Sequence, residues 1–424
     1  MSTIYNNRYY YLNKHFLIVI GQWPYQSRLR ANVMLAITLF FLFSLTAFEF
    51  WGLIAGIKNL NIVMENSSPL LVNSFIIVKL TNCFFNKHKM KKLLDDIEET
   101  WKMKQNGPEN EILRSYAEKS KIFFKQYAFG LYMMWLFYTT MPIVVNGVYR
   151  FLPTNDTYSA RFLYRLEHVV DMDKYFNLLM FHGFIRVFYI VAVPIALDTF
   201  FMLCVNYVCA LFENIRRVSL FFFSKFQTAD RLQDDLKKPL KMSNIFIGYN
   251  LERIPARTDV LFSSNITDDK NYDIIVYCIK WYKHALNFFE LLSSTFATSF
   301  LFVLGNTLVC LSFTAAELIV VDVQLDKIIR IIANNVAQLF HLLSLNLTSQ
   351  LLIDSSNEFQ TVIYSCNWYA TSVRCRHLLR LTLLRASKPC QIKAGKMYVM
   401  SLETFSSILQ VSISYFTVLT SMQL

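Results

Sequence analysis

The chain has 424 residues, of which 54% are hydrophobic and 16% aromatic, and its mean hydropathy is positive. This composition is too apolar for an ordinary soluble domain and indicates a protein embedded in a membrane. The formal net charge of +12 is compatible with nucleic acid or with an anionic membrane surface, and the position of the basic residues decides between them.

Seven stretches are long and apolar enough to cross a hydrocarbon core, which takes about 20 mostly uncharged helical residues. They predict an all-α polytopic membrane protein. The expected spans are 31–56, 68–86, 127–149, 187–212, 291–316, 331–353 and 397–422. The second is the weakest, because Asn73 and Lys79 interrupt it. No cleavable signal is expected, since the apolar piece "FLIVI" is too short and no small-residue cleavage site follows it.

Lys and Arg residues concentrate in alternate loops. The segment before the first span and the loops after the second, fourth and sixth spans hold most of them, and the other loops hold few. Basic loops remain in the cytoplasm, so the amino terminus is predicted inside and the carboxyl terminus outside. The charge therefore marks a cytoplasmic face, and nucleic acid is not an expected partner.

Two Asn-X-Ser/Thr triplets provide a test that does not use charge. Asn66 and Asn155 have the form of glycosylation acceptors and fall in loops predicted outside. The eight cysteines lie in spans or cytoplasmic segments. They are expected to be small buried thiols without structural disulfides.

Four regions follow from this pattern. They are a cytoplasmic amino-terminal segment (1–30), the first six spans with their loops (31–353), a cytoplasmic helical region (354–395) and the last span (396–424).

Two cytoplasmic segments are predicted to be helical. Met90, Leu94, Ile97 and Trp101 recur at helical spacing among charged residues. Another helical stretch over 358–386 is rich in arginine, and fits either a helix on anionic lipid or a packing platform between subunits.

Two interruptions are also predicted. Pro389 and Gly395 predict a helix break near 387–396. The segment 216–248 has the composition of a structureless interruption.

The last span keeps a polar line along one face, because alternating steps of three and four residues place side chains on the same side of a helix. The line consists of Glu403, Ser407, Gln410, Ser414, Thr417 and Ser421. Two interpretations stay open: helix packing with hydroxyls bonded to their own backbone, or the lining of a water-filled pathway. The second requires several copies around an axis, and a ring of Glu403 there favours cations.

Three carboxylates within the spans need partners. Glu49, Asp198 and Glu290 are expected to face protein or water, mainly in structural roles. Asp198 lies one turn after Pro194, where it is suited to compensate a kinked backbone. The sequence has no metal-ligand spacing, phosphate loop or nucleophile motif, so neither enzyme activity nor a cofactor is expected.

The outer halves of spans two to five carry aromatic and methionine side chains. Such residues are usually core or lipid contacts, but they also suit a small apolar ligand. These candidate ligand-binding residues are Phe75, Tyr138, Met141, Phe181, Phe184, Phe188 and Phe302.

The carboxyl-terminal stretch contains "NWY", "KPC", "AGK", "YVMSLETF" and "SYFTVLTSM" in that order. This succession resembles the signature of insect odorant receptors. "GQWPY" at 21–25, "GYNLERI" at 248–254 and the stretch 272–292 are similar to other elements of the family, particularly of hymenopteran members. The resemblance thus extends over nearly the whole chain.

The resemblance implies a tetrameric, odorant-gated, nonselective cation channel of inverted seven-helix topology in the plasma membrane of olfactory neuron dendrites. It implies a small volatile hydrophobic ligand bound in the outer half of spans two to six, and an obligate co-receptor as partner subunit. The ending of the chain looks like that of a ligand-tuned subunit rather than of the co-receptor. By match to the family's ending, Val418 and Met422 are expected to form the gate.

Three other classes remain as alternatives. A G-protein-coupled receptor has the opposite topology, and a gustatory-type receptor channel has a different carboxyl-terminal ending. A transporter is disfavoured by the lack of internal repeats or paired broken helices. One departure from the family pattern is the segment 216–247, which is either an insertion or an artefact of gene prediction.

Overall fold

The structure is a computed structural model. It describes residues 4–421 apart from 59, 105–106, 108, 152–171, 225–267, 321–324, 366–367, 369–370 and 396. The elements in chain order are a 3-10 turn (Ile4–Asn6), α1 (Tyr11–Val19), α2 (Arg28–Ala55), α3 (Leu60–Phe85), α4 (Lys87–Met103), α5 (Glu109–Phe151), α6 (Met172–Ser224), α8 (Asp268–Val320), α9 (Leu325–Ser365), α10 (Val373–Ala386), β1 (Lys393–Ala394), β2 (Tyr398–Val399) and α11 (Leu402–Ser421). The prediction of an all-α protein is confirmed, with one short antiparallel hairpin among the described residues.

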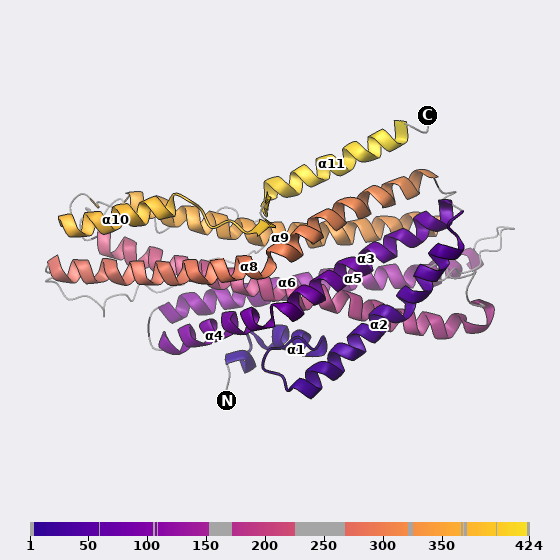
Figure 1. Cartoon of the computed structure of the whole chain (residues 1–424), viewed down its shortest axis with the longest axis horizontal. Helices are drawn as coiled ribbons and strands as arrows, with labels where there is room; N and C mark the ends of the chain where they lie inside the picture. The colour runs from indigo at the N-terminus through magenta and orange to yellow at the C-terminus, as the bar shows by residue number, and fades with distance from the viewer. Residues whose placement is uncertain are drawn as a thin grey trace.

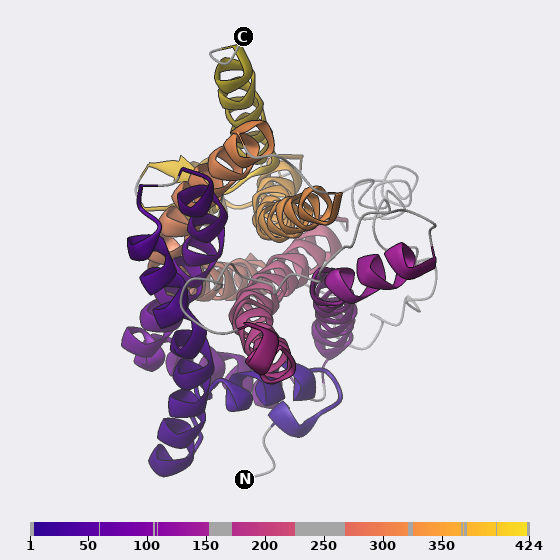
Figure 2. The same ribbon diagram turned by 90° about the vertical axis from the view of Figure 1, so that its right-hand side faces the viewer.

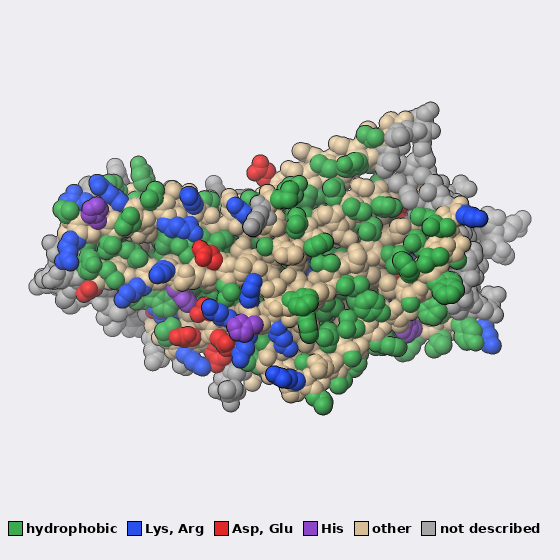
Figure 3. All heavy atoms as spheres, in the orientation of Figure 1, with side chains coloured by type: hydrophobic (Ala, Val, Ile, Leu, Met, Phe, Trp, Pro, Cys, Tyr) green, Lys and Arg blue, Asp and Glu red, His purple; other side chains and the backbone are tan. Residues whose placement is uncertain are grey.

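Long helices determine the shape of the molecule. Helices α6 and α8 each have 53 residues, which is about 80 Å at 1.5 Å per residue and far exceeds the ~30 Å of a hydrocarbon core. Each therefore continues well beyond its expected span, and Figure 1 shows both running along most of the molecule. In Figure 3, basic side chains gather over the half that carries α4 and α10, and hydrophobic side chains dominate the other half.

Five helical segments are long and apolar enough to cross a membrane: 28–55, 66–85, 177–220, 272–315 and 328–365. They overlap five of the seven expected spans. Of the other two, 127–149 lies in α5, and 397–422 begins too early, because β2 precedes α11 and α11 starts only at Leu402; neither helix is among these five.

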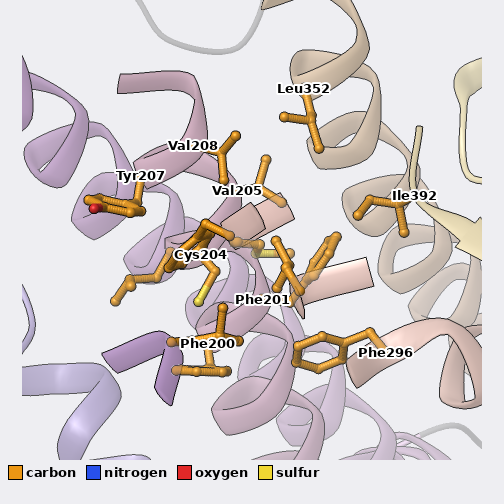
Figure 4. Packing of buried hydrophobic residues seen from close by; sticks show 14 of the residues in the cluster. Phe200, Phe201, Cys204, Val205, Tyr207, Val208, Phe296, Leu352 and Ile392 are labelled. Carbon is orange, nitrogen blue, oxygen red and sulfur yellow. The ribbon is translucent and has the colours of Figure 1, made fainter. Parts of the chain in front are cut away.

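Helix α6 lies at the centre of the bundle, surrounded by the other long helices (Figure 2). Its segment 190–215 is apolar almost all round, a pattern that requires burial on every side. Figure 4 shows Phe200, Phe201 and Cys204 within the core. The Phe201 ring packs edge to face on Phe296 of α8, with ring centroids 5.3 Å apart.

The amphipathic helix predicted around Met90 is confirmed as α4, which buries Met90, Leu94, Ile97 and Trp101. The amino-terminal segment packs against it, and the Trp101 indole N–H donates to the Tyr10 hydroxyl at 3.0 Å.

Several details differ from expectation. Asn66 lies inside α3 with only 1% of its surface exposed, so its assignment to an outer loop as a glycosylation acceptor is wrong for this conformation. The reason is that α3 begins at Leu60, more than two turns before position 68, where the span was expected to begin. Asn155 lies outside the described residues.

Residues 216–224 are also not a structureless interruption, because α6 continues to Ser224. Arg216 and Arg217 support this extension by pairing with Glu213, three and four residues earlier on the helix, at 2.6 Å each. The rest of the 216–247 segment lies outside the described residues.

The helical stretch predicted over 358–386 is divided. Helix α9 continues the sixth span to Ser365, and the separate helix α10 follows from Val373. Of the cysteines in the described part of the chain, Cys278 is half-buried and the other six are buried, and all are free thiols. Cys366 lies outside that part.

Candidate functional site

The segment between α10 and α11 contains the helix break that Pro389 and Gly395 predict. Helix α10 ends at Ala386, and the hairpin of β1 and β2 turns at Gly395, whose φ of 61° suits glycine. The Gly395 N–H donates to the carbonyl of Ala297 on α8 at 2.7 Å. Burial raises the pKa of the neighbouring Cys390 thiol to about 11, which keeps it protonated and unreactive at neutral pH.

The first turn of α11 is fixed to the bundle. The Ser401 hydroxyl accepts from the N–H of Thr404 at 3.2 Å, as an N-cap does. The side-chain oxygen of Gln350 on α9 accepts from the N–H of Leu402 at 3.4 Å. The base of α11 is therefore held by both α8 and α9.

Beyond this base, α11 leaves the bundle (Figures 1 and 2). Phe405 and Ile408 pack against the core, but Ile413, Tyr415 and Val418 are exposed. A helix of this composition is unstable with all faces in water. Its exposed surface therefore belongs against lipid, other protein, or both.

The members of the polar line share one exposed face of α11. They are Glu403, Ser407, Gln410, Ser414, Thr417 and Ser421. The hydroxyls of Ser407 and Ser414 donate to carbonyls four residues earlier, at 3.0 and 2.9 Å, and Thr417 does the same at 3.0 Å. The hydrogens are thus satisfied along the helix, and the oxygen lone pairs remain available on its surface.

The expected gate residues are only partly described. Val418 is 54% exposed on α11, and Met422 lies outside the described residues. One helix cannot enclose a pore, so a constriction at Val418 requires neighbouring subunits.

A buried ionic cluster lies deep in the membrane part. The Asp198 carboxylate on α6 accepts from the Lys79 ammonium on α3 at 2.5 and 2.6 Å and from the Tyr127 hydroxyl on α5 at 2.9 Å. The His341 ring nitrogen on α9 lies 2.9 Å from the same carboxylate. Asp198 therefore joins four helices and does not serve as a local correction after Pro194, as the sequence had suggested.

A second buried pair lies nearby. Arg186 on α6 forms two hydrogen bonds with Glu49 on α2, at 2.5 and 3.2 Å, and both side chains are fully buried. Asn73 on α3 donates to the same carboxylate at 2.9 Å. The expectation that Glu49 and Asp198 face protein is confirmed, whereas Glu290 is exposed.

The candidate ligand-binding residues do not form one cluster. Phe75 is partly buried, and its ring lies edge to face on His341 at 5.1 Å. Tyr138 and Met141 on α5 are half-buried. These three are therefore at least partly covered by the chain itself.

The remaining four are exposed in the single chain. Phe181 and Phe302 are 66% and 55% exposed. Phe184 and Phe188 are partly covered by Trp135 and Tyr132 of α5, with centroid distances of 4.4 and 5.5 Å. The positions of these four suit contact with lipid or a neighbouring subunit better than an enclosed pocket.

Sequence reasoning missed the partners within the ionic clusters. The apolar runs mark Lys79 only as an interruption of a span and do not single out Tyr127, Arg186 or His341. The sequence does contain a signal for Lys79, Arg186 and His341, because a basic or histidine side chain in an apolar helix requires a counter-charge. In the described part of the chain, no group of three His, Cys, Asp or Glu side chains is arranged to hold a metal ion.

Comparisons with known proteins agree with this architecture. The family model for the 7tm odorant receptor matches residues 59–413. The insect olfactory receptor OR5 from Machilis hrabei, solved in complex with eugenol, has a similar fold, with a TM-score of 0.71 over 97% of each chain at 12% sequence identity.

The curated relatives include an odorant receptor coreceptor and an odorant receptor. The odorant receptor coreceptor of Drosophila melanogaster is 25% identical over 152 residues, which are 35% of this chain and 31% of that protein. Odorant receptor 10 of Aedes albopictus is 38% identical over 66 residues, which are 16% and 18% of the two chains. The matches span a third or less of the length of these relatives. The chain is thus similar to the co-receptor over 152 residues, and the expectation that its ending is that of a ligand-tuned subunit stays a prediction.

The family model covers most of the chain, including the central bundle and most of α11, and it favours neither a G-protein-coupled nor a gustatory-type receptor. The chain is a member of the 7tm odorant receptor family.

Proposed function

We propose that this chain is a ligand-tuned odorant receptor subunit that forms an odorant-gated, nonselective cation channel with an obligate co-receptor. It acts in the plasma membrane of the olfactory neuron dendrite, with its amino terminus in the cytoplasm and its carboxyl terminus outside. The observation that carries the proposal is α11, an amphipathic helix that is fixed to the bundle at its base and, in the described part of the chain, exposes its outer half.

The pathway is formed by copies of α11 from four subunits around one axis. The polar line from Glu403 to Ser421 faces that axis, because hydroxyl oxygens with free lone pairs solvate passing cations. The neutral hydroxyls select weakly among cations, and Glu403 at the inner end disfavours anions. The apolar faces of α11 turn to lipid and to neighbouring helices.

The gate is an apolar ring at Val418 and Met422. A narrow apolar constriction blocks ions by excluding water. Separation of the helices at this level wets the pathway and allows conduction.

The ligand is a small volatile hydrophobic molecule bound in the outer half of the bundle, and Phe75, Tyr138 and Met141 are the interior candidates for contact with it. Binding opens the channel only if the ligand has a higher affinity for the open arrangement than for the closed one. Phe181, Phe184, Phe188 and Phe302 complete this site only if a neighbouring element covers them.

An odorant panel tests the function directly. Cells expressing this chain with the co-receptor, the chain alone, or the co-receptor alone are exposed to volatile compounds while cation current is recorded. An odorant-evoked current that requires both subunits is expected. Responses identical to those of the co-receptor alone, with this chain present at the cell surface, contradict the proposal.

A further inference from the structure

Asp198 is the meeting point of four membrane helices. Its carboxylate contacts Lys79 of α3, Tyr127 of α5 and His341 of α9 within 2.9 Å. The side chains of Lys79 and Asp198 are each 2% exposed. Bulk water therefore has little access to this ion pair.

The opposite charges of Lys79 and Asp198 make this cluster stable when its contacts are formed and costly when they are separated. The Lys79 ammonium directs its hydrogens to both Asp198 oxygens and lies 2.8 Å from the Nε2 atom of His341. Any movement that separates α3 from α6 leaves the charges of Lys79 and Asp198 unpaired in a poorly solvated interior, unless the groups find water or a ligand. Packed contacts of this kind favour discrete arrangements over continuous deformation.

The cluster directly adjoins a candidate ligand residue. The Lys79 ammonium lies 4.7 Å from the centre of the Phe75 ring, and the His341 ring lies edge to face on Phe75 at 5.1 Å. A molecule that binds against this part of Phe75 must displace Lys79 or His341.

The cluster is also connected to the last helix. His341 and Gln350 are nine residues apart on α9, which is about 13 Å along the helix. Gln350 accepts the hydrogen bond from Leu402 at the base of α11. A shift of α9 therefore acts directly on the attachment of α11.

We propose that Asp198, Lys79, His341 and Tyr127 form a latch that holds α3, α5, α6 and α9 in the non-conducting arrangement, and that a ligand against Phe75 opens it. This inference rests on the proposed channel function. The four side chains are positioning residues, because they act on the pathway through α9 and α11. Weakening the latch lowers the cost of reaching the open state, so it raises basal current and lowers the odorant concentration for half-maximal current (EC50).

Two variants test the latch in cells that also express the co-receptor. Tyr127→Phe removes one hydrogen bond and keeps the ring stacked on Phe340, whose centroid is 5.9 Å away. The double variant Lys79→Met with Asp198→Leu removes both charges together and leaves neither unpaired. Basal current and EC50 are measured for each variant, and currents are divided by the amount of receptor at the cell surface.

A matched control uses the other buried pair. Glu49→Gln weakens contacts with Arg186 on α6 and Asn73 on α3. It is expected to reduce the amount of receptor at the surface and to leave the surface-normalised basal current and EC50 unchanged.

The double variant is expected to lower EC50 about fivefold or more and to raise basal current, and Tyr127→Phe is expected to change both in the same direction by less. Unchanged or higher EC50 with unchanged basal current, in a receptor whose wild-type form responds to odorant, overturns the latch and leaves the channel function intact. If the double variant does not reach the surface, the basal current and EC50 of Tyr127→Phe alone test the latch, by the same criterion. Absence of any odorant-evoked current in the wild type instead overturns the proposed function, and the latch falls with it.

Discussion

Charged side chains in the membrane part are paired between helices that lie far apart in the sequence. Asp198 and Lys79 are 119 positions apart, and Arg186 and Glu49 are 137 apart. The sequence predicted that Glu49 and Asp198 need partners, because an unpaired charge in an apolar helix is costly. It could not name the partners, since no local spacing connects residues on different helices.

Removal of Lys79 alone is expected to destabilise the protein by about 3–5 kcal/mol, because Asp198 then stays buried without its counter-charge. Lys79→Met is therefore predicted to lower the midpoint of heat-induced aggregation of the detergent-solubilised receptor. The double variant Lys79→Met with Asp198→Leu should recover most of the loss. Equal midpoints for the wild type and Lys79→Met would show that the pair contributes little to stability.

Val418 allows a prediction about the gate. Replacement by serine makes the proposed apolar ring easier to wet. Val418→Ser, expressed with the co-receptor, is expected to raise basal cation leak without removing the odorant response. Unchanged resting current and unchanged odorant response together count against Val418 as a gate residue.

At the scale of elements, helical periodicity predicted most helices, and Pro389 with Gly395 predicted the break before α11. The extension of α6 to Ser224 and the early start of α3 were not predicted. Helix propensity and tertiary packing extend these helices past the apolar runs that marked the spans. The boundaries of short helices such as α10 are also hard to predict, because an apolar stretch of sequence can continue from one helix, across a turn, into the next.

Gly395 is expected to be needed for the hairpin that leads into α11. Its φ is 61°, and a Cβ atom there would lie 3.0 Å from the Leu301 side chain. Gly395→Ala is predicted to cost about 1 kcal/mol or more of stability, seen as a lower aggregation midpoint.

Gly305 on α8 is the matched control. A Cβ atom there meets nothing within 4 Å, so Gly305→Ala is predicted to be neutral or stabilising by up to about 1 kcal/mol. A similar effect of both substitutions would contradict the assigned role of the Gly395 turn.

At the scale of the whole molecule, composition and charge predicted a helical membrane protein, and the terminal motifs predicted its family. The candidate site was only partly predictable. The face of α11 that carries Ser407 and Ser414 follows from helical geometry alone. The positions of the ligand residues do not follow from helical geometry, because the exposure of Phe181 and Phe302 depends on how the helices pack.

The proposed orientation predicts the accessibility of the two chain ends. The segments α4 and α10 lie in the same half of the molecule (Figure 1), and their basic residues place that half toward the cytoplasm. An epitope tag before Met1 should be labelled only after permeabilisation, and a tag after Leu424 should be labelled on intact cells. The reverse pattern would contradict the orientation and favour a G-protein-coupled arrangement.

The central claim is that the polar face of α11 lines a wet axis shared by several subunits. Cysteine placed at Ser414 tests it, because a charged, membrane-impermeant thiol reagent reacts only where water reaches. Phe416 provides the control position, since it lies about 200° around the helix from Ser414. The buried native thiol of Cys390, with its raised pKa, is expected to contribute little background.

The measurement is the odorant-evoked cation current of Ser414→Cys and Phe416→Cys, each expressed with the co-receptor, before and after extracellular reagent is applied in the presence of odorant. The account predicts irreversible loss or reduction of current in Ser414→Cys and no change in Phe416→Cys. Modification at Phe416 with none at Ser414 would place the hydroxyl face away from water and contradict conduction along α11.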